Sequence, residues 1–137
     1  MVTILAEFGH SDATAAGYLH DVIEDTAVDR EQIASVFGDD VAAAVAFCSD
    51  EPGPTRKDRK RATYARMAAD VRTHSPWIAM AVRAKVADRL ANVRSSSADN
   101  PRLLATYKAE MQTFREALYM PGVCDSMWSA LADLLAE

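Results

Sequence analysis

The chain has little of what interrupts helices or builds strands. Its 137 residues include five glycines and five prolines, and no run of alternating β-branched residues is present. Glycine and proline disfavour helix interiors most strongly, and a half-buried strand requires alternation of apolar and polar residues. Half of the residues are hydrophobic, which is enough for a substantial core. The sequence therefore predicts an all-α protein, folded as one compact multi-helix domain over residues 1–137.

Other absences narrow the class of protein. No apolar run approaches the roughly 18 residues that a membrane helix needs, and the first residues do not resemble a signal peptide. Cys48 and Cys124 form no CxxC pair, so we expect reduced thiols in or near the core. The net charge of −5 argues against a general nucleic-acid binder. We expect a soluble, cytoplasmic protein that binds neither membranes nor nucleic acid.

Helical patterns follow one another along the chain and are separated by short breaks. Breaks are predicted at Gly9, at 51–54, at 73–76, at the serines 95–97 and at 121–122, and Gly38 is expected to split one long pattern in two. No internal repeat is present. The predicted helices cover residues 1–8, 12–26, 30–49, 56–72, 77–94, 99–119 and 123–136.

A strip of polar residues lies along the predicted helix 12–26. Residues four apart stack on one face of a helix, which places His20 over Glu24. The same spacing places Asp21 over Asp25. Charge clusters on helices are commonly solvated faces, so from the spacing alone a surface strip and a functional site are equally good interpretations.

The predicted helix 77–94 adds a second unusual carboxylate. Val82, Val86, Leu90 and Val93 form one apolar stripe, and Asp88 lies in a second stripe of small residues. A helix that is apolar on two sides packs on two sides. The carboxylate of Asp88 is then expected opposite a cation, a metal or strong hydrogen-bond donors, because an unpaired buried charge is costly.

An ion pair of Asp88 with Arg89, Arg94 or another basic residue would satisfy that requirement. The alternative is that this carboxylate and the neighbouring pair of His20 and Asp21 form a ligand set for a divalent ion.

Two stretches in combination resemble a known family. "HDVIEDT", residues 20–26, and "KVADRLANVR", residues 85–94, look like the HD superfamily of metal-dependent phosphohydrolases. More narrowly they resemble the guanosine polyphosphate 3′-pyrophosphohydrolase branch, the hydrolase half of RelA/SpoT proteins and their small stand-alone relatives. The resemblance extends to "RKDRKRATYARM" (56–67) and "YKAEMQTFREALY" (107–119). It implies an all-α HD-domain bundle and a small-molecule nucleotide substrate.

The resemblance also implies roles for individual residues. His20, Asp21 and Asp88 match metal ligands of the family, with Mn²⁺ or another divalent metal as cofactor. Glu24 and Asp25 match the carboxylates that position and deprotonate the attacking water. A divalent ion activates water and withdraws charge from a phosphoryl oxygen, and a nearby carboxylate accepts the proton.

Three further positions match contacts to the nucleotide in the family. Asn92 matches a residue that faces the nucleotide, Tyr107 an aromatic near the guanosine, and Arg56 a basic contact to phosphate. Independently, residues 56–66 contain six positive charges and one negative charge, and this local excess would attract a polyanion. A solvated face is the alternative for most of these side chains, so we expect one or two of them to touch substrate.

One feature departs from the family pattern. Family members carry a further metal-ligand histidine in a His-Pro pair, which precedes the segment that residues 1–8 resemble. This sequence contains no such pair. We therefore expect a domain that is short at its N-terminus, with three protein ligands, and neither His10 nor His74 reaches the site simply. Self-association is left open, because a shortened first helix could leave an apolar strip uncovered.

The sequence supports two classes of function. The first is removal of the 3′-pyrophosphate from guanosine tetra- or pentaphosphate, or hydrolysis of another 2′- or 3′-phosphorylated nucleotide such as NADPH. The second is a catalytically attenuated nucleotide-binding or regulatory module that retains the fold.

Overall fold

The computed structural model describes residues 2–9, 16, 19 and 26–136. All regular structure in these residues is helical, which confirms the all-α prediction. Of the predicted helix 12–26, only Ala16, Leu19 and Thr26 belong to the described residues. The helices are α1 (Val2–Glu7), α3 (Arg30–Phe37), α4 (Asp39–Cys48), α5 (Arg56–Val71), α6 (Ile78–Asp99), α7 (Pro101–Leu118) and α8 (Asp125–Ala136).

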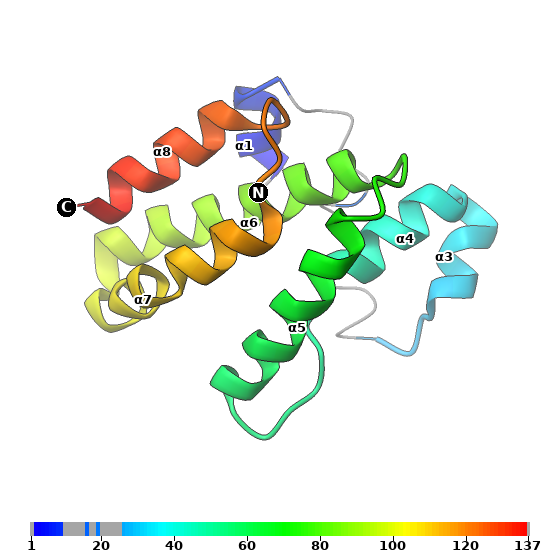
Figure 1. The fold of residues 1–137 in the computed structure, drawn as a ribbon, viewed down its shortest axis with the longest axis horizontal. Coiled ribbons are helices and arrows are strands. Elements are labelled where there is room, and N and C mark those ends of the chain that lie inside the picture. Colours follow the sequence, from blue (N-terminus) through cyan, green and yellow to red (C-terminus); the bar gives the residue numbers. More distant parts are fainter. Residues whose placement is uncertain (1, 10–15, 17–18, 20–25, 137) are drawn as a thin grey trace.

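Helix α6 runs through the middle of the molecule (Figure 1). It packs against α1, α4, α7 and α8, while α5 packs on α7 and α3 on α4. The expectation that this helix is covered on two sides is confirmed, because both its branched and its small apolar residues are buried. The buried apolar residues of α6 are Ile78, Ala81, Val82, Ala84, Val86, Ala87, Leu90 and Val93.

The ends of α5 and α7 follow from local chemistry. Thr55 precedes α5, and its hydroxyl oxygen accepts a hydrogen bond from the Asp58 backbone N–H at 3.1 Å. Asn100 precedes α7, and its side chain accepts a hydrogen bond from the Leu103 N–H at 3.1 Å, with Pro101 in the first turn. Such caps satisfy backbone donors that have no partner inside the helix.

The expected division of the 30–49 pattern at Gly38 is confirmed. Gly38 ends α3 and precedes α4 with φ +94°, a conformation that favours glycine because it has no Cβ atom. The predicted break at 121–122 also stands, since Gly122 lies between α7 and α8 with φ +83°.

The predicted break at serines 95–97 is wrong. Helix α6 continues to Asp99, five residues beyond the predicted end. Ser96 is buried, and its hydroxyl donates a hydrogen bond to the Asn92 carbonyl oxygen at 2.7 Å. A serine that bonds the carbonyl four residues earlier is satisfied inside a helix. The helix instead ends at Asn100, because a residue before proline disfavours the helical conformation.

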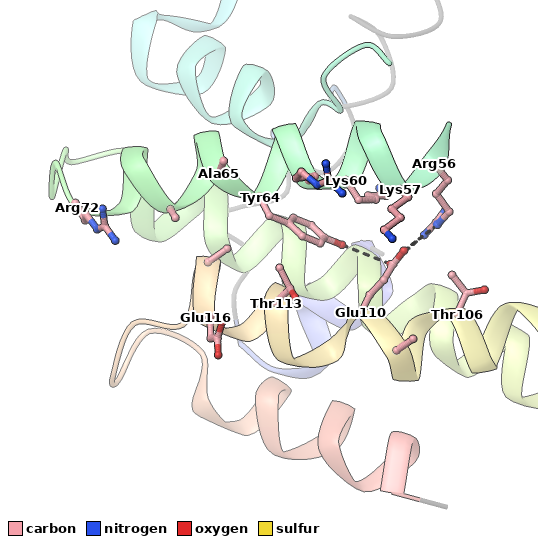
Figure 2. Close-up of a pocket in the computed structure, with 14 residues that line it drawn as sticks. Arg56, Lys57, Lys60, Tyr64, Ala65, Arg72, Thr106, Glu110, Thr113 and Glu116 are labelled. Carbon is pink, nitrogen blue, oxygen red and sulfur yellow. Dashed lines mark hydrogen bonds and ion pairs between the residues drawn. The ribbon is translucent and has the colours of Figure 1, made fainter. Parts of the chain in front are cut away.

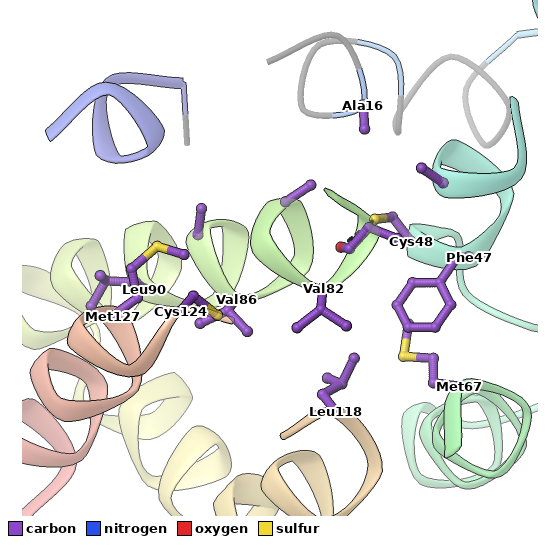
Figure 3. Close-up of a cluster of buried hydrophobic side chains, with 14 of the residues drawn as sticks. Ala16, Phe47, Cys48, Met67, Val82, Val86, Leu90, Leu118, Cys124 and Met127 are labelled. Carbon is purple, nitrogen blue, oxygen red and sulfur yellow. Dashed lines mark hydrogen bonds between the residues drawn. The ribbon is translucent and has the colours of Figure 1, made fainter. Parts of the chain in front are cut away.

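The core is built around aromatic rings and the apolar face of α6. The ring of Phe114 contacts those of Trp128 at 5.4 Å and Tyr64 at 5.9 Å between centroids. Cys48 and Cys124 are buried thiols, as expected, and burial raises the pKa of the Cys124 thiol to about 12. Figure 3 shows the side chains of α6 directed toward those of the surrounding elements, such as Leu118 and Met127.

Leu90 tests the central position of α6. This side chain is fully buried, so Leu90→Ala removes contacts on a helix covered by four others. We expect the free energy of unfolding to fall by about 2–5 kcal/mol, measured by urea denaturation. Val36→Ala, at a position that is 73% exposed, should change it by less than about 0.5 kcal/mol. Equal effects of the two substitutions would contradict this packing.

Candidate functional site

The predicted site residues divide into two groups. His20, Asp21, Glu24 and Asp25 lie outside the described residues, so their assignments stay predictions. Asp88 and Asn92 lie on α6, Arg56 at the start of α5, and Tyr107 on α7.

Asp88 lies in a largely buried, charged part of α6. Its side chain is 24% exposed, and its Oδ2 atom lies 3.9 Å from the ammonium nitrogen of Lys85 on the same helix. Lys85 is itself buried and donates a hydrogen bond to the Cys48 carbonyl oxygen at 3.2 Å. Of the expected partners, a cation, a metal or strong donors, the structure shows one cation, Lys85, near this carboxylate.

The two arginines considered as partners of Asp88 pair with other residues. Arg89 lies 3.3 Å from the Glu110 carboxylate, and Arg94 pairs with Glu7 of α1 at 2.9 Å. An i, i+1 or i, i+6 spacing does not place side chains together on a helix, whereas the i, i+3 spacing of Lys85 and Asp88 does.

The Asp88 carboxylate suits one ligand position of a hard divalent ion. It offers oxygen donors, and it is shielded from water without being fully enclosed. Within residues 2–9, 16, 19 and 26–136, no group of three His, Cys, Asp or Glu side chains could hold a metal ion. The other two predicted ligands, His20 and Asp21, lie outside these ranges.

Asn92 lies one turn beyond Asp88 and is exposed. Because residues four apart share a helix face, its amide lies on the same side of α6 as the carboxylate. The two residues that the resemblance assigns to metal and nucleotide are thus neighbours on one helix.

Arg56 and Tyr107 are brought together from α5 and α7. The guanidinium carbon of Arg56 lies 5.7 Å from the centre of the Tyr107 ring. Arg56 also pairs with Glu110 through two hydrogen bonds, from Nε to Oε2 at 2.9 Å and from Nη2 to Oε1 at 3.2 Å. This hydrogen bonding raises the pKa of the Arg56 guanidinium, which therefore stays charged.

A second arginine lies beneath this contact. Arg89 is 4% exposed, and its guanidinium carbon lies 4.8 Å from the Tyr107 ring and 4.3 Å from the Phe114 ring. Its Nη2 atom donates to the Tyr64 hydroxyl at 2.6 Å. Burial raises the pKa of Tyr64, so this hydroxyl stays protonated near neutral pH. Tyr107 is 6% exposed and is thus mainly a support for the two arginines.

Another ion pair joins the segment after α4 to α5. The ammonium group of Lys60 contacts both carboxylate oxygens of Asp50, at 2.9 and 3.0 Å. Burial raises the pKa of Asp50, but the hydrogen bond and charge of Lys60 outweigh it, and Lys85 and Arg56 add to the lowering. The pKa of the carboxyl group is therefore held below its usual range.

Lys60 experiences the opposite balance. Burial lowers its pKa, and the positive charge of Lys85 lowers it further, while Asp50 opposes both. Lys60 and Lys85 bind the chain at and just after the end of α4, through the Asp50 carboxylate and the Cys48 carbonyl oxygen, respectively.

A groove of about 900 Å³ lies between α5 and α7 (Figure 2). Figure 2 shows Arg56 and Tyr64 directed toward Glu110 near one end, and Glu116 toward the other end. Small side chains line much of it, and five cations face two carboxylates. The charged residues of the lining are Arg56, Lys57, Lys60, Arg61, Arg72, Glu110 and Glu116.

The basic stretch 56–66 serves two purposes. Arg66 donates to the carbonyl oxygens of Ala46 and Phe47 at 3.1 Å, which satisfies the end of α4, and it pairs with Glu51. Lys57 and Arg61 form no ion pair with any residue that the structure describes. Part of the stretch is thus structural, and part faces the groove.

Four residues of this network were not predicted from the sequence. The sequence indicated no individual role for Asp50, Lys60 or Glu110, and it indicated Arg89 only as a possible ion-pair partner of Asp88. Lys60, Arg89 and Glu110 lie inside stretches that carry the resemblance, but Asp50 lies in the segment that follows α4. No periodic signal relates Glu110 to Arg56, which lies 54 positions away.

Comparison with known proteins identifies the family. A family model described as an HD domain matches residues 1–116. The chain belongs to the HD domain family. This match covers α1 and α3–α6 and most of α7, and therefore includes every predicted site residue.

The curated relatives are RelA/SpoT-type proteins, as the motifs indicated. The chain is 33% identical over 106 residues to a Synechocystis protein named "Probable guanosine-3′,5′-bis(diphosphate) 3′-pyrophosphohydrolase". It is 35% identical over 100 residues to "Probable GTP diphosphokinase RSH2, chloroplastic" of rice, Oryza sativa, and 38% identical over 99 residues to a "GTP pyrophosphokinase" of Streptomyces coelicolor.

These matches cover only part of each relative. They include 72%, 69% and 69% of this chain, but only 13%, 14% and 11% of the respective relatives. No solved structure matches the chain. Among the described residues, no helix combines the length and apolar character required to cross a bilayer.

The Asp50–Lys60 pair gives a pH-dependent prediction. The folded-state pKa of Asp50 is lowered, so its contribution to stability is full well above about pH 4 and disappears as the pH falls through the folded-state pKa. Asp50→Asn leaves the largely buried Lys60 ammonium without its counter-ion. We expect a loss of about 1–3 kcal/mol at pH 7 and a smaller loss at pH 3, measured by chemical denaturation.

Asp133→Asn, an exposed carboxylate on α8, is the control and should change stability by less than about 0.5 kcal/mol at both pH values. A loss for Asp50→Asn that does not depend on pH would contradict the proposed charge interaction.

Proposed function

We propose that this chain is a metal-dependent phosphohydrolase that removes the 3′-pyrophosphate from guanosine tetra- or pentaphosphate. The observation that carries the proposal is the position of Arg56 and Tyr107. Both are matched to nucleotide contacts by the resemblance: Arg56 lines a groove rich in positive charge, and the buried Tyr107 ring, which comes from another helix, supports its guanidinium. Membership of the HD domain family supports hydrolytic chemistry, and the name of the Synechocystis relative supports this particular nucleotide.

The proposed ligands of a divalent ion are His20, Asp21 and Asp88. When bound, the ion supplies Lewis acidity that activates water at neutral pH and withdraws charge from a phosphoryl oxygen. The Asp88 carboxylate, held near Lys85, keeps a defined position on the covered helix α6.

The remaining chemistry belongs to the carboxylates and cations of the chain. Glu24 and Asp25 would orient the attacking water and accept its proton as the new oxygen–phosphorus bond forms. The bond between that phosphorus and the 3′ oxygen breaks, and the 3′ oxygen gains a proton. Arg56 would bind a phosphate through two parallel hydrogen bonds, and Asn92 would face the nucleotide.

A nucleotide-binding module that does not hydrolyse its ligand is the second candidate. Arg56, Lys57 and Arg61 border the groove on α5, and their charges do not depend on the metal ligands. The chain could therefore retain an anionic ligand even where a metal centre is weak. Another 2′- or 3′-phosphorylated nucleotide, such as NADPH, is the alternative substrate, because the motifs specify the hydrolytic chemistry more closely than the base.

We also propose that residues 1–137 form one domain. Helix α8 lies beyond the matched range 1–116, but it packs on α6 and buries Met127, Trp128 and Leu131. Its apolar face therefore completes the same core.

The metal assignment is tested with Asp88→Asn. We expect the variant to lose bound Mn²⁺ and at least about 100-fold in pyrophosphate release from guanosine tetraphosphate, because a ligand of the ion is lost. Metal content by mass spectrometry and product by chromatography are the measurements. Asp99→Asn, an exposed carboxylate near the end of the same helix, should retain metal and turnover.

The proposed base is tested with Glu24→Ala and Asp25→Ala. Both variants should bind Mn²⁺ but lose turnover, because neither carboxylate is assigned to the metal. Turnover that survives in both variants would refute the mechanism. Absence of both Mn²⁺ uptake and turnover in the unsubstituted chain would favour the binding module.

A further inference from the structure

Glu110 is shared by two arginines that differ sharply in exposure. The Arg56 side chain is 40% exposed and lies at the groove, whereas the Arg89 side chain is 4% exposed. Both reach the same carboxylate, Arg56 at 2.9 Å and Arg89 at 3.3 Å. One partner is accessible to a ligand and the other is not.

The inner arginine is fixed. Its guanidinium lies against the rings of Tyr107 and Phe114 and donates to the Tyr64 hydroxyl. Moving it would expose a buried charge or break these contacts. Arg89 therefore stays beside Glu110 whatever Arg56 does.

The outer arginine has no comparable enclosure. Apart from the Tyr107 ring at 5.7 Å, the described contacts that hold Arg56 are its two hydrogen bonds to Glu110. A phosphate offers the same planar, two-point recognition to a guanidinium as a carboxylate does. An arriving phosphate can therefore replace Glu110 without loss of hydrogen bonds by Arg56.

We propose that Glu110 is a positioning residue that occupies Arg56 until a phosphate ligand takes it over. Arg89 then remains as the counter-ion of Glu110, so the exchange leaves no buried carboxylate unpaired. The Tyr64 hydroxyl, at 3.5 Å from Glu110, is a further donor to the same carboxylate. The inference rests on the proposed function, because the role of Arg56 as a phosphate contact belongs to it.

This arrangement sets the affinity for anions and their selection. A ligand binds Arg56 only if it attracts the guanidinium more strongly than the Glu110 carboxylate does. This requirement lowers the affinity for weakly charged anions more than the affinity for pyrophosphate groups. The carboxylate also keeps the guanidinium in one orientation before the ligand arrives. Glu110 therefore raises selectivity at the expense of affinity.

The test measures binding of inorganic pyrophosphate to the full chain by calorimetry, without added metal. Glu110→Gln retains an acceptor for Arg89 but removes the charge that holds Arg56. We expect pyrophosphate to bind about fivefold more tightly, as expected from loss of a partly exposed competing ion pair. A substitution that only damaged the fold would weaken binding instead.

Two variants separate this effect from a change in net charge. Glu110→Asp preserves the charge but shortens the side chain, so it withdraws from Arg56 while remaining a counter-ion for Arg89. It should also bind pyrophosphate more tightly, by about twofold, and it provides the test if Glu110→Gln does not fold. Asp133→Asn removes a charge from the exposed face of α8, outside the groove, and should leave the affinity for pyrophosphate unchanged.

The Arg56→Gln background completes the cycle. There Glu110→Gln should no longer increase affinity, because the arginine that it releases is missing. Unchanged or weaker binding in folded Glu110 variants would overturn the proposal. An equal gain for Asp133→Asn, or a gain that persists without Arg56, would overturn it as well.

The outcome is separate from that of the proposed function. Tighter pyrophosphate binding by Glu110→Gln in a chain without hydrolytic activity would support this inference and count against the enzyme. Metal-dependent turnover together with an unaltered pyrophosphate affinity would do the reverse.

Discussion

The constraint on which the rest of the structure depends is the burial of charge on a central helix. Helix α6 is covered by α1, α4, α7 and α8, yet it carries Lys85, Asp88 and Arg89 within five positions. Lys85 and Arg89 are nearly inaccessible to water, and a buried charge is tolerated only where partners are supplied. The neighbouring segments supply them: the end of α4 provides the Cys48 carbonyl to Lys85, and α7 provides Glu110 to Arg89. The positions of these helices are therefore coupled to the chemistry of α6.

The same pairing of buried cations with groups from neighbouring segments explains where the candidate site lies. One oxygen of the Glu110 carboxylate, Oε1, lies next to Arg89, and the other, Oε2, accepts a hydrogen bond from Arg56. This second contact links α5 to α7 beside the groove. Asp50 plays the equivalent part for Lys60 at the end of α4. Each carboxylate thus serves both as an internal counter-ion and as a link between elements. The groove is lined by five cations and two carboxylates on a chain with a net charge of −5, a distribution that would attract an anion to it.

Much of the fold could be predicted from the sequence because its signals are local. Apolar periodicity located the helices, and Gly38 and Gly122 located two breaks correctly. The break predicted at serines 95–97 was wrong because serines are common in loops but also fit inside a helix. There a hydroxyl such as that of Ser96 donates to a carbonyl oxygen of the preceding turn. The site was less predictable. Motifs singled out Asp88 and Arg56 as candidates, but the partner of Arg56 depends on how α5 and α7 pack, which no sequence spacing encodes.

A site for a polyanion must remain stable when no anion is present. A cluster of unpaired arginines would repel one another in the empty protein, whereas arginines fully committed to carboxylates could not bind. Sharing one carboxylate between an enclosed and an accessible guanidinium resolves this conflict, because only the accessible one has to change partners. Lys57 and Arg61, which are solvated and form no ion pair with the described residues, can contribute attraction at longer range without that requirement. The burial of Arg89 is thus what allows Arg56 to be both compensated and available, and it follows from the central position of α6.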